Sequence, residues 1–194
     1  MGTVRSHMSI SLDGFVAGPD VSLEQPMGVG GKRLHDWLFD GPSDPHDAEV
    51  AAEMFDPATT GAVIMGRRTF EVGQDPWGED GTFRLPCFVV TSRPAENLVK
   101  GPTSFTFVTD GIEAALARAQ AVAGARAVNV MGARTTQQFL GARLLDEIQL
   151  NLGPVLLGKG TRLFEHLGAA LIEFERMRMV ASPAMTHLTY RVVK

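Results

Sequence analysis

A group of polar residues directly after the apolar run G-A-V-I-M has the chemistry of a phosphate-binding site. Gly66 lets the backbone approach a ligand closely. Next come Arg67, Arg68 and Thr69, whose two guanidinium groups and hydroxyl can form charge-assisted hydrogen bonds. A helix that begins here would add free N–H groups and the positive end of its dipole. Taken alone, the segment is equally compatible with a solvated basic turn that Thr69 caps.

A second segment of this kind, Thr91-Ser92-Arg93-Pro94, follows the apolar run P-C-F-V-V. Its two hydroxyls and its guanidinium group suit the 2′-phosphate that distinguishes NADP from NAD. The simpler alternative for this segment is a polar turn that Pro94 closes.

The third segment has a glycine between an apolar run and a predicted helix. Met131 ends the run V-N-V-M, Gly132 and Ala133 follow it, and Thr135 and Thr136 lie in the first turn of the helix. This arrangement places backbone amides around a pyrophosphate. The pattern G-x-G-x-x-G is absent, so the segment is not an ordinary Rossmann fingerprint. Three anion-binding segments at three strand ends are less easily explained by chance than one.

Strands and helices alternate along the chain, which predicts an α/β domain with a mainly parallel sheet. The last two strands predict an antiparallel hairpin, so the sheet is mixed. Ligands of such sheets bind at the carboxyl ends of the strands, where the three polar segments are expected. Residues 18–41 are irregular and glycine-rich, which is typical of a loop over a site. The expected strands are 4–11, 61–65, 86–91, 104–108, 126–131, 147–152, 170–180 and 185–193; the expected helices are 45–55 with Asp44 as N-cap, 67–72, 110–123 with Asp110 as cap, and 133–140.

Composition limits the class of protein. A chain of 194 residues suits one domain over 1–194, and a net charge of −4 argues against a nucleic-acid partner. The single Cys87 excludes an internal disulfide framework and fits a reducing, cytoplasmic setting. Neither a signal peptide nor an apolar stretch of the roughly 20 residues that a membrane helix needs is found. The five histidines show no metal-ligand spacing, so no metal is expected.

Several segments resemble known reductases. G-A-V-I-M-G-R-R-T-F-E, V-V-T-S-R and V-M-G-A are similar to the nucleotide-binding segments of dihydrofolate reductases. The stretches H-M-S-I-S-L-D-G-F-V-A-G and L-L-D-E-I-Q-L-N-L-G-P-V-L-L-G-K-G-T-R-L-F are more similar to the C-terminal reductase domain of riboflavin-biosynthesis deaminase–reductases and its stand-alone bacterial relatives. The resemblance covers residues 4–193 and implies a three-layer dihydrofolate-reductase-like fold.

The resemblance implies an NADPH site with a role for each polar segment. The backbone near Ser9 and Ala17 would flank the nicotinamide, and Ala133 stands where the family usually has a second glycine. The remaining cofactor contacts would come from Gly66, Arg67, Arg68 and Thr69 for the phosphates, Thr91, Ser92 and Arg93 for the 2′-phosphate, and Met131, Gly132, Ala133, Thr135 and Thr136 for the pyrophosphate.

The substrate side matches the relatives less well. Asp13 corresponds to an aspartate on the substrate side of the riboflavin enzymes, and it or Glu53 or ordered water would supply a proton. The position of the pterin-binding acid of dihydrofolate reductases falls on Val50, which argues against folate reduction. A solvated helix face is the alternative for Glu49 and Glu53. Asp47 is expected to support the helix N-terminus.

The implied activity is hydride transfer from NADPH to a small heterocycle, similar to 5-amino-6-(5-phosphoribosylamino)uracil reductase. A pterin-type reductase and a non-catalytic NADPH-binding protein are the alternatives. Trp77 is expected to stack on the substrate or to shield the core, and His7 to be a structural histidine with satisfied hydrogen bonds. Cys87 is expected to be inert core. The apolar hairpin at the chain end predicts a homodimer.

Overall fold

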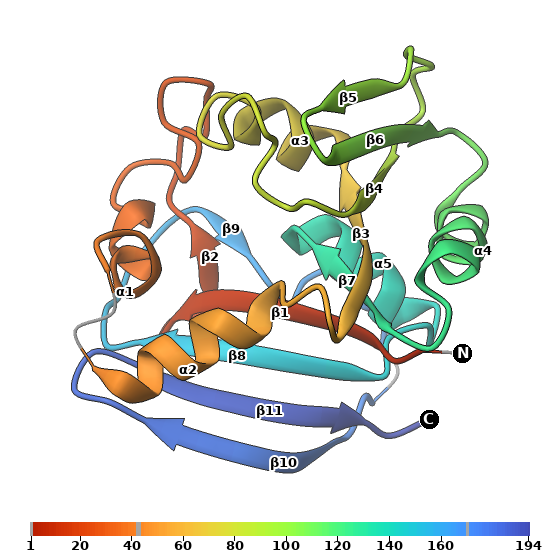
Figure 1. Cartoon of the computed structure of the whole chain (residues 1–194). Coiled ribbons are helices and arrows are strands. Elements are labelled where there is room, and N and C mark those ends of the chain that lie inside the picture. The colour runs from red at the N-terminus through yellow and green to blue at the C-terminus, as the bar shows by residue number, and fades with distance from the viewer. Residues whose placement is uncertain (1, 42–43, 170) are drawn as a thin grey trace.

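The computed structural model describes residues 2–41, 44–169 and 171–194. Its main sheet has nine strands in the order β10-β11-β8-β1-β7-β3-β4-β6-β5 (Figure 1). The strands are β1 (Val4–Ser11), β3 (Thr60–Gly66), β4 (Pro86–Val90), β5 (Leu98–Lys100), β6 (Thr103–Val108), β7 (Ala127–Met131), β8 (Glu147–Gly153), β10 (Phe174–Ala181) and β11 (Thr186–Val192). Two further short strands, β2 (Phe15–Ala17) and β9 (Thr161–Arg162), pair with each other.

The sheet is mixed, as predicted. The six strands from β8 through β1, β7, β3 and β4 to β6 pair in parallel. Strands β10 and β11 form an antiparallel hairpin that continues the sheet from β8, and β5 pairs antiparallel with β6. β1 therefore lies between β8 and β7, close to the middle of the sheet (Figure 1).

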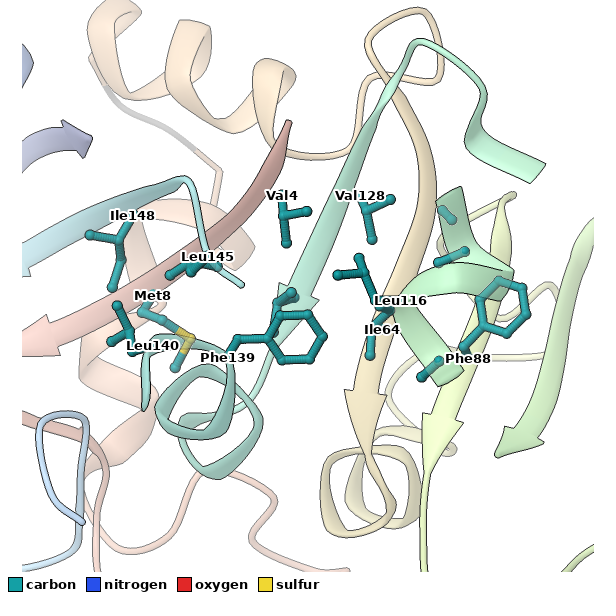
Figure 2. Packing of buried hydrophobic residues seen from close by; sticks show 14 of the residues in the cluster. Val4, Met8, Ile64, Phe88, Leu116, Val128, Phe139, Leu140, Leu145 and Ile148 are labelled. Atoms are coloured by element: carbon teal, nitrogen blue, oxygen red, sulfur yellow. The ribbon is translucent and has the colours of Figure 1, made fainter. Parts of the chain in front are cut away.

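Helices cover both faces, which gives the predicted three layers. On one face, α4 (Ile112–Ala123) and α5 (Ala133–Gly141) pack through Leu116 and Phe139 against apolar side chains of β1, β3 and β7 (Figure 2). On the other face lie α2 (Pro45–Met54) and α3 (Arg67–Gly73), with the short helices η1 (Gly31–Leu34) and α1 (Asp36–Phe39) beside α2. The face that holds α2 is called the α2 side below.

Local sequence explains how tightly these layers pack. β3 reads T-G-A-V-I-M-G and is buried on both faces, as expected for a strand of a covered parallel sheet. A Cβ at Gly61 would lie 2.5 Å from the Cα of Ala123, so this glycine allows α4 to rest directly on β3. Asp44 caps α2 by accepting a hydrogen bond from the His46 N–H at 2.8 Å, as predicted.

Three expectations about local structure were wrong. Asp110 does not cap α4, because the helix begins at Ile112 with Gly111 as its N-cap, and the Asp110 carboxylate pairs with Arg118 at 2.8 Å. The region 18–41 is irregular only in part, since it contains η1 and α1. The first strand of the hairpin begins at Phe174; residue 170, where it was expected to begin, lies outside the described residues. Within the described ranges, no helix is long and apolar enough to span a membrane.

Candidate functional site

The structure brings the three predicted phosphate-binding segments together at one edge of the sheet. They follow β7, β3 and β4, which are neighbouring parallel strands, so their carboxyl ends lie side by side. Gly66 is paired with Val90, the residue before Thr91, and a Cβ on Gly66 would come within 2.9 Å of the Thr135 hydroxyl. A Cβ on Gly132 would likewise meet the Thr69 hydroxyl, at 2.4 Å. This edge is called the strand-end site below.

Two guanidinium groups in the strand-end site converge on one carboxylate. The Glu71 Oε1 accepts a hydrogen bond from Arg67 Nε at 2.9 Å and another from Arg93 Nη2 at 3.2 Å. Arg67 also lies over the ring of Phe107, 5.1 Å from its centre, and its Nη1 is shielded without a partner among the described residues. The site therefore holds two cations from two strand ends and one anion between them, an arrangement that a phosphate can enter by taking the place of the carboxylate.

The start of α5 leaves backbone N–H groups without helical partners. The first helical hydrogen bond runs from the Thr136 N–H to the Gly132 carbonyl at 3.0 Å, so the N–H groups of the preceding helical residues are left without helical partners. Gly132 has a φ of 88°, which is accessible to glycine at little cost. Thr136 itself was wrongly assigned to the cofactor, because its N–H is used in the helix and its hydroxyl lies 2.9 Å from Ser6 in the core.

The other predicted cofactor residues differ in their contacts. Arg68 donates to the carbonyl of Val21, which ties α3 to the loop that follows β2. The Thr91 hydroxyl accepts from the Arg93 N–H at 3.0 Å and shapes the polar turn that was the alternative for this segment, while Ser92 is exposed. Ala17 ends β2 and pairs with Thr161 of β9.

Asp13 is a brace rather than a proton donor. Its carboxylate accepts from the Ser11 hydroxyl at 2.6 Å and from the N–H groups of Leu157 and Gly158 at 3.1 and 2.7 Å. The Ser11 hydrogen bond, together with those backbone donors, lowers the pKa of Asp13 from 3.8 to about 2. The carboxyl group is therefore ionised at neutral pH, and the predicted role as proton donor does not fit. Its position fixes the turn after β8 against the turn after β1.

Glu53 does not lie free as a proton donor either. Its Oε2 accepts from Arg178 Nη1 at 2.7 Å, while Glu49 accepts from the other terminal nitrogen of Arg178 at 2.7 Å. All three side chains are exposed on the surface where α2 faces β10. The structure thus agrees with the alternative of a solvated helix face.

Trp77 packs against aromatic residues of the core. Its ring lies 4.8 Å from that of Phe83 in an edge-on contact and stacks over Phe105 at 6.2 Å. A Cβ on Gly73 would lie 2.2 Å from the Trp77 ring, so α3 packs directly against it. This packing agrees with the alternative that Trp77 shields the core, and its role in substrate binding stays a prediction.

A buried polar network on the α2 side joins α2 to two strands. Asp47 Oδ1 lies 2.9 Å from His187 Nε2, and His187 Nδ1 lies 2.8 Å from Asn151 Oδ1. Asn151 Oδ1 also accepts from the amide of Gln149 at 3.0 Å. Asp47 lies in the first turn of α2, as predicted, and Asp47 and His187 are only 1% and 2% exposed, so Asp47 also holds α2 on the sheet.

His7 of β1 was expected to be a structural histidine with satisfied hydrogen bonds. Both of its ring nitrogens are shielded from solvent and have no hydrogen-bond partner among the described residues. Burial, and after it the nearby charge of Arg5, lower the pKa of His7 from 6.5 to about 3. The expected hydrogen bonds of His7 are therefore not made within the described protein.

Comparison of the sequence with models of known protein families identifies a family for this chain. The model of the RibD C-terminal domain matches residues 2–187, almost the whole chain. The chain belongs to this family. The predicted resemblance to the C-terminal domain of the riboflavin deaminase–reductases is therefore confirmed.

Individual members and structures agree with the RibD C-terminal domain assignment. The uncharacterized protein YwjB of Bacillus subtilis (strain 168) is 28% identical over 168 residues, which cover 83% of this chain and 82% of that protein. A candidate riboflavin biosynthesis protein from Shewanella sp. PV-4 superposes with a TM-score of 0.69 at 21% identity, with 99% of each chain covered. Dihydrofolate reductase from Enterococcus faecalis, solved with NADP(H), gives a TM-score of 0.61 at 17% identity over 100% of this chain and 98% of that one. At these identities the two structures confirm the dihydrofolate-reductase-like fold.

Two polar features of this RibD C-terminal domain were not predicted from the sequence: the inward orientation of Asp47 and the two arginine contacts of Glu71. Asp47 shares its helix face with Val50 and Met54, because residues three and seven positions further on lie on the same side. That apolar spacing is a signal that Asp47 points inward. Glu71 carries no comparable signal, since its role depends on Arg93, which is distant in sequence and close only in the fold.

Proposed function

We propose that this protein is an NADPH-dependent reductase that transfers a hydride to a carbon of a small heterocycle, similar to 5-amino-6-(5-phosphoribosylamino)uracil reductase. The observation that carries the proposal is the pair of guanidinium groups, Arg67 and Arg93, that meet at Glu71 beside the start of α5. Membership in the RibD C-terminal domain family supports it. So does the fold shared with a dihydrofolate reductase that was solved with NADP(H).

The residues present fit this cofactor. The unpartnered Arg67 Nη1 is a shielded donor that a phosphate oxygen can satisfy, and Arg93 is exposed and free to turn toward a 2′-phosphate. The N–H groups at the start of α5 suit the pyrophosphate. Ser9 at the carboxyl-end half of β1 and Ala17 on β2 would hold the nicotinamide by their backbones.

In the proposed reaction the bound nicotinamide supplies the hydride, and the protein binds, orients and shields the reactants. A proton must also reach the substrate. Asp13 is ionised and braced, and Glu53 is paired with Arg178, so the chain contributes no carboxylic acid from these two positions. We assign the proton to water admitted from the surface.

Titration of the protein with NADPH and NADH, followed by nucleotide fluorescence, tests the cofactor half of the proposal. We expect NADPH to bind at least several-fold more tightly than NADH. Oxidation of NADPH against a panel of pyrimidines and pterins, followed by absorbance at 340 nm, a wavelength at which only the reduced nicotinamide absorbs, tests the reductase half. Equal affinity for the two nucleotides contradicts the assignment of the 2′-phosphate site.

A non-catalytic NADPH-binding protein is the second candidate, and the engaged state of Asp13 and Glu53 favours it. NADPH binding without oxidation by any member of the panel would support this candidate. A pterin reductase is disfavoured, because Val50, which stands at the position of the pterin-binding acid, is 1% exposed in an apolar cluster.

We also propose that the protein is a homodimer that pairs through the hairpin. β10 is an edge strand, and three of its large apolar side chains are exposed in the single chain: Phe174, Met177 and Met179. An exposed edge of this kind favours pairing with a second copy. Light scattering at micromolar concentration should give twice the mass of one chain, and Met179→Lys should lower it to the monomer mass. A monomer mass for the unmodified protein across that range rejects the dimer.

A further inference from the structure

The side chains of β1 on the α2 side form a polar row. Arg5, Ser9 and Ser11 belong to it, while Val4, Met8 and Ile10 point into the core on the opposite face. His7 lies between Arg5 and Ser9 and, by the alternation of a strand, on the same face as they do. This row runs along the middle of the sheet.

Each of the other members of the row has hydrogen bonds. Arg5 donates to Asn129 at 2.8 Å and to Thr60 at 2.7 Å. Ser9 accepts from the Trp37 indole at 3.3 Å, and Ser11 bonds Asp13 and the Phe15 N–H. His7 alone in this row has no partner among the described residues. A shielded polar group without a hydrogen-bond partner is unfavourable. A ligand that supplies the missing hydrogen bond to His7 would not have to displace a protein group from it.

The cross-strand neighbour of His7 makes its own hydrogen bond elsewhere. Its register partner on β8 is Gln149, whose amide is committed to Asn151 at 3.0 Å. On β7, Val130 pairs with Ser6, so His7 is level with the end of that strand, immediately before Gly132. The backbone of His7 thus lies beside the end of β7, where the strand-end site begins, and the residue is half-buried although both ring nitrogens are shielded.

We propose that His7 is a substrate-binding residue of this reductase, and that its ring hydrogen-bonds an uncharged heterocycle that carries carbonyl and ring N–H groups. This inference rests on the proposed function and names the substrate class for it. A neutral imidazole offers one donor and one acceptor, which match a carbonyl oxygen and a ring N–H. The low pKa of His7, about 3, keeps the ring neutral at physiological pH, so it favours the heterocycle over a phosphate group of the same substrate.

Lumazine, a pteridinedione with both groups, is the probe for this site. Its binding to the protein saturated with NADP⁺ can be followed by its own fluorescence. We expect His7→Leu to weaken lumazine binding about 3- to 10-fold, the range for loss of one neutral hydrogen bond. His7→Gln keeps a donor and an acceptor and should weaken it less. NADPH affinity should stay unchanged in both variants, and the exposed His166 provides the control His166→Leu.

Two further readouts separate recognition from a structural role. Because His7 makes no hydrogen bond within the described protein, His7→Leu should melt at the same temperature as the unmodified protein or higher. In the unmodified protein labelled with ¹⁵N-histidine, lumazine should shift the ring nitrogens of His7 and leave those of His166 in place.

The outcomes distinguish this inference from the proposed function. Unchanged lumazine affinity in His7→Leu, an unshifted His7 ring, or NADPH binding without any lumazine binding overturns the role of His7 and leaves the cofactor site intact. A protein that binds neither NADPH nor NADH overturns the proposed function itself. A lower melting temperature of His7→Leu with an unshifted ring in the unmodified protein makes His7 structural.

Discussion

The strand-end site pairs arginines with a carboxylate, and the polar network beneath α2 pairs a histidine with a carboxylate. The two regions differ in their access to water. At the strand ends, Arg93 is 70% exposed and joined to Glu71 by a single contact of 3.2 Å. Beneath α2, Asp47 and His187 are almost fully buried. An exposed ion pair contributes little and exchanges easily, whereas a buried pair is costly to break. The first arrangement suits a ligand, and the second holds the sheet and α2 together.

The largest expected effect is on stability, from the buried network. Asp47→Ala leaves His187 shielded without its partner and should destabilise the fold by about 3–5 kcal/mol. For a chain of this size, that corresponds to a decrease of roughly 6–20 °C in Tm. Thermal unfolding measures it. Glu49→Ala, on the exposed side of the same helix, is the matched control and should cost less than about 1 kcal/mol. If both variants lose a similar amount of unfolding free energy, the buried network is no more important for stability than the exposed ion pair.

The second effect is on ligand affinity, at the strand ends. Arg93→Ala removes a cation from the proposed 2′-phosphate site and should cost NADPH on the order of 1.5–3 kcal/mol, at least several-fold in affinity after screening by solvent. NADH lacks the phosphate and should bind as before. Arg118→Ala, which removes another exposed arginine from an ion pair, serves as control. Equal losses for both nucleotides mean that Arg93 does not contact the 2′-phosphate.

A smaller and opposite effect is expected for the carboxylate between the arginines. Glu71→Gln removes the negative charge that competes with a phosphate for Arg67 and Arg93. NADPH should bind more tightly by a factor of about 2–5, within the range of one exposed charge pair. The gain should shrink at high salt. Weaker NADPH binding would show that Glu71 positions the arginines instead of competing for them. Glu175→Gln is the control on the distant hairpin.

The smallest effect concerns pH and Asp13, which lies near the site but acts as a brace. Its folded-state pKa, about 2, lies below the ordinary value of 3.8, so its stabilisation is fully present above about pH 4 and is lost as the pH falls toward 2. Asp13→Asn should therefore be less stable than the unmodified protein at pH 7, with a difference that closes between pH 4 and 2. Melting temperatures across pH 2–7 test this. A difference that stays constant down to pH 2 excludes the carboxylate as the source.

The fold was predictable because its signals are local. The buried runs that became β3, β4 and β7 are short and mainly apolar, and each occurs where it was expected. The strands β2, β5 and β9 were missed because two or three residues carry no period. Asp110 was misjudged because a glycine at the next position offered the chain a different helix start.

The candidate site was predictable only in part. Residue types at strand ends located the strand-end site, since parallel strands bring their ends together. What each side chain touches could not be derived, because the partners are far apart in sequence. Asp13 is braced by Leu157 and Gly158, and the indole of Trp77 is covered by Phe105. Thr136 was assigned from its position in the helix, whereas its hydroxyl faces Ser6.

The central place of β1 has a consequence for how the chain is made. Arg5 bonds Asn129 across 124 residues, and Val4 bonds Asp146 across 142. A ribosome that adds about 5–20 residues per second therefore exposes the first strand for on the order of ten seconds before its neighbours exist. During that time its apolar face is available to chaperones and to neighbouring chains. Such high contact order predicts slow folding, completed only after synthesis has passed β8.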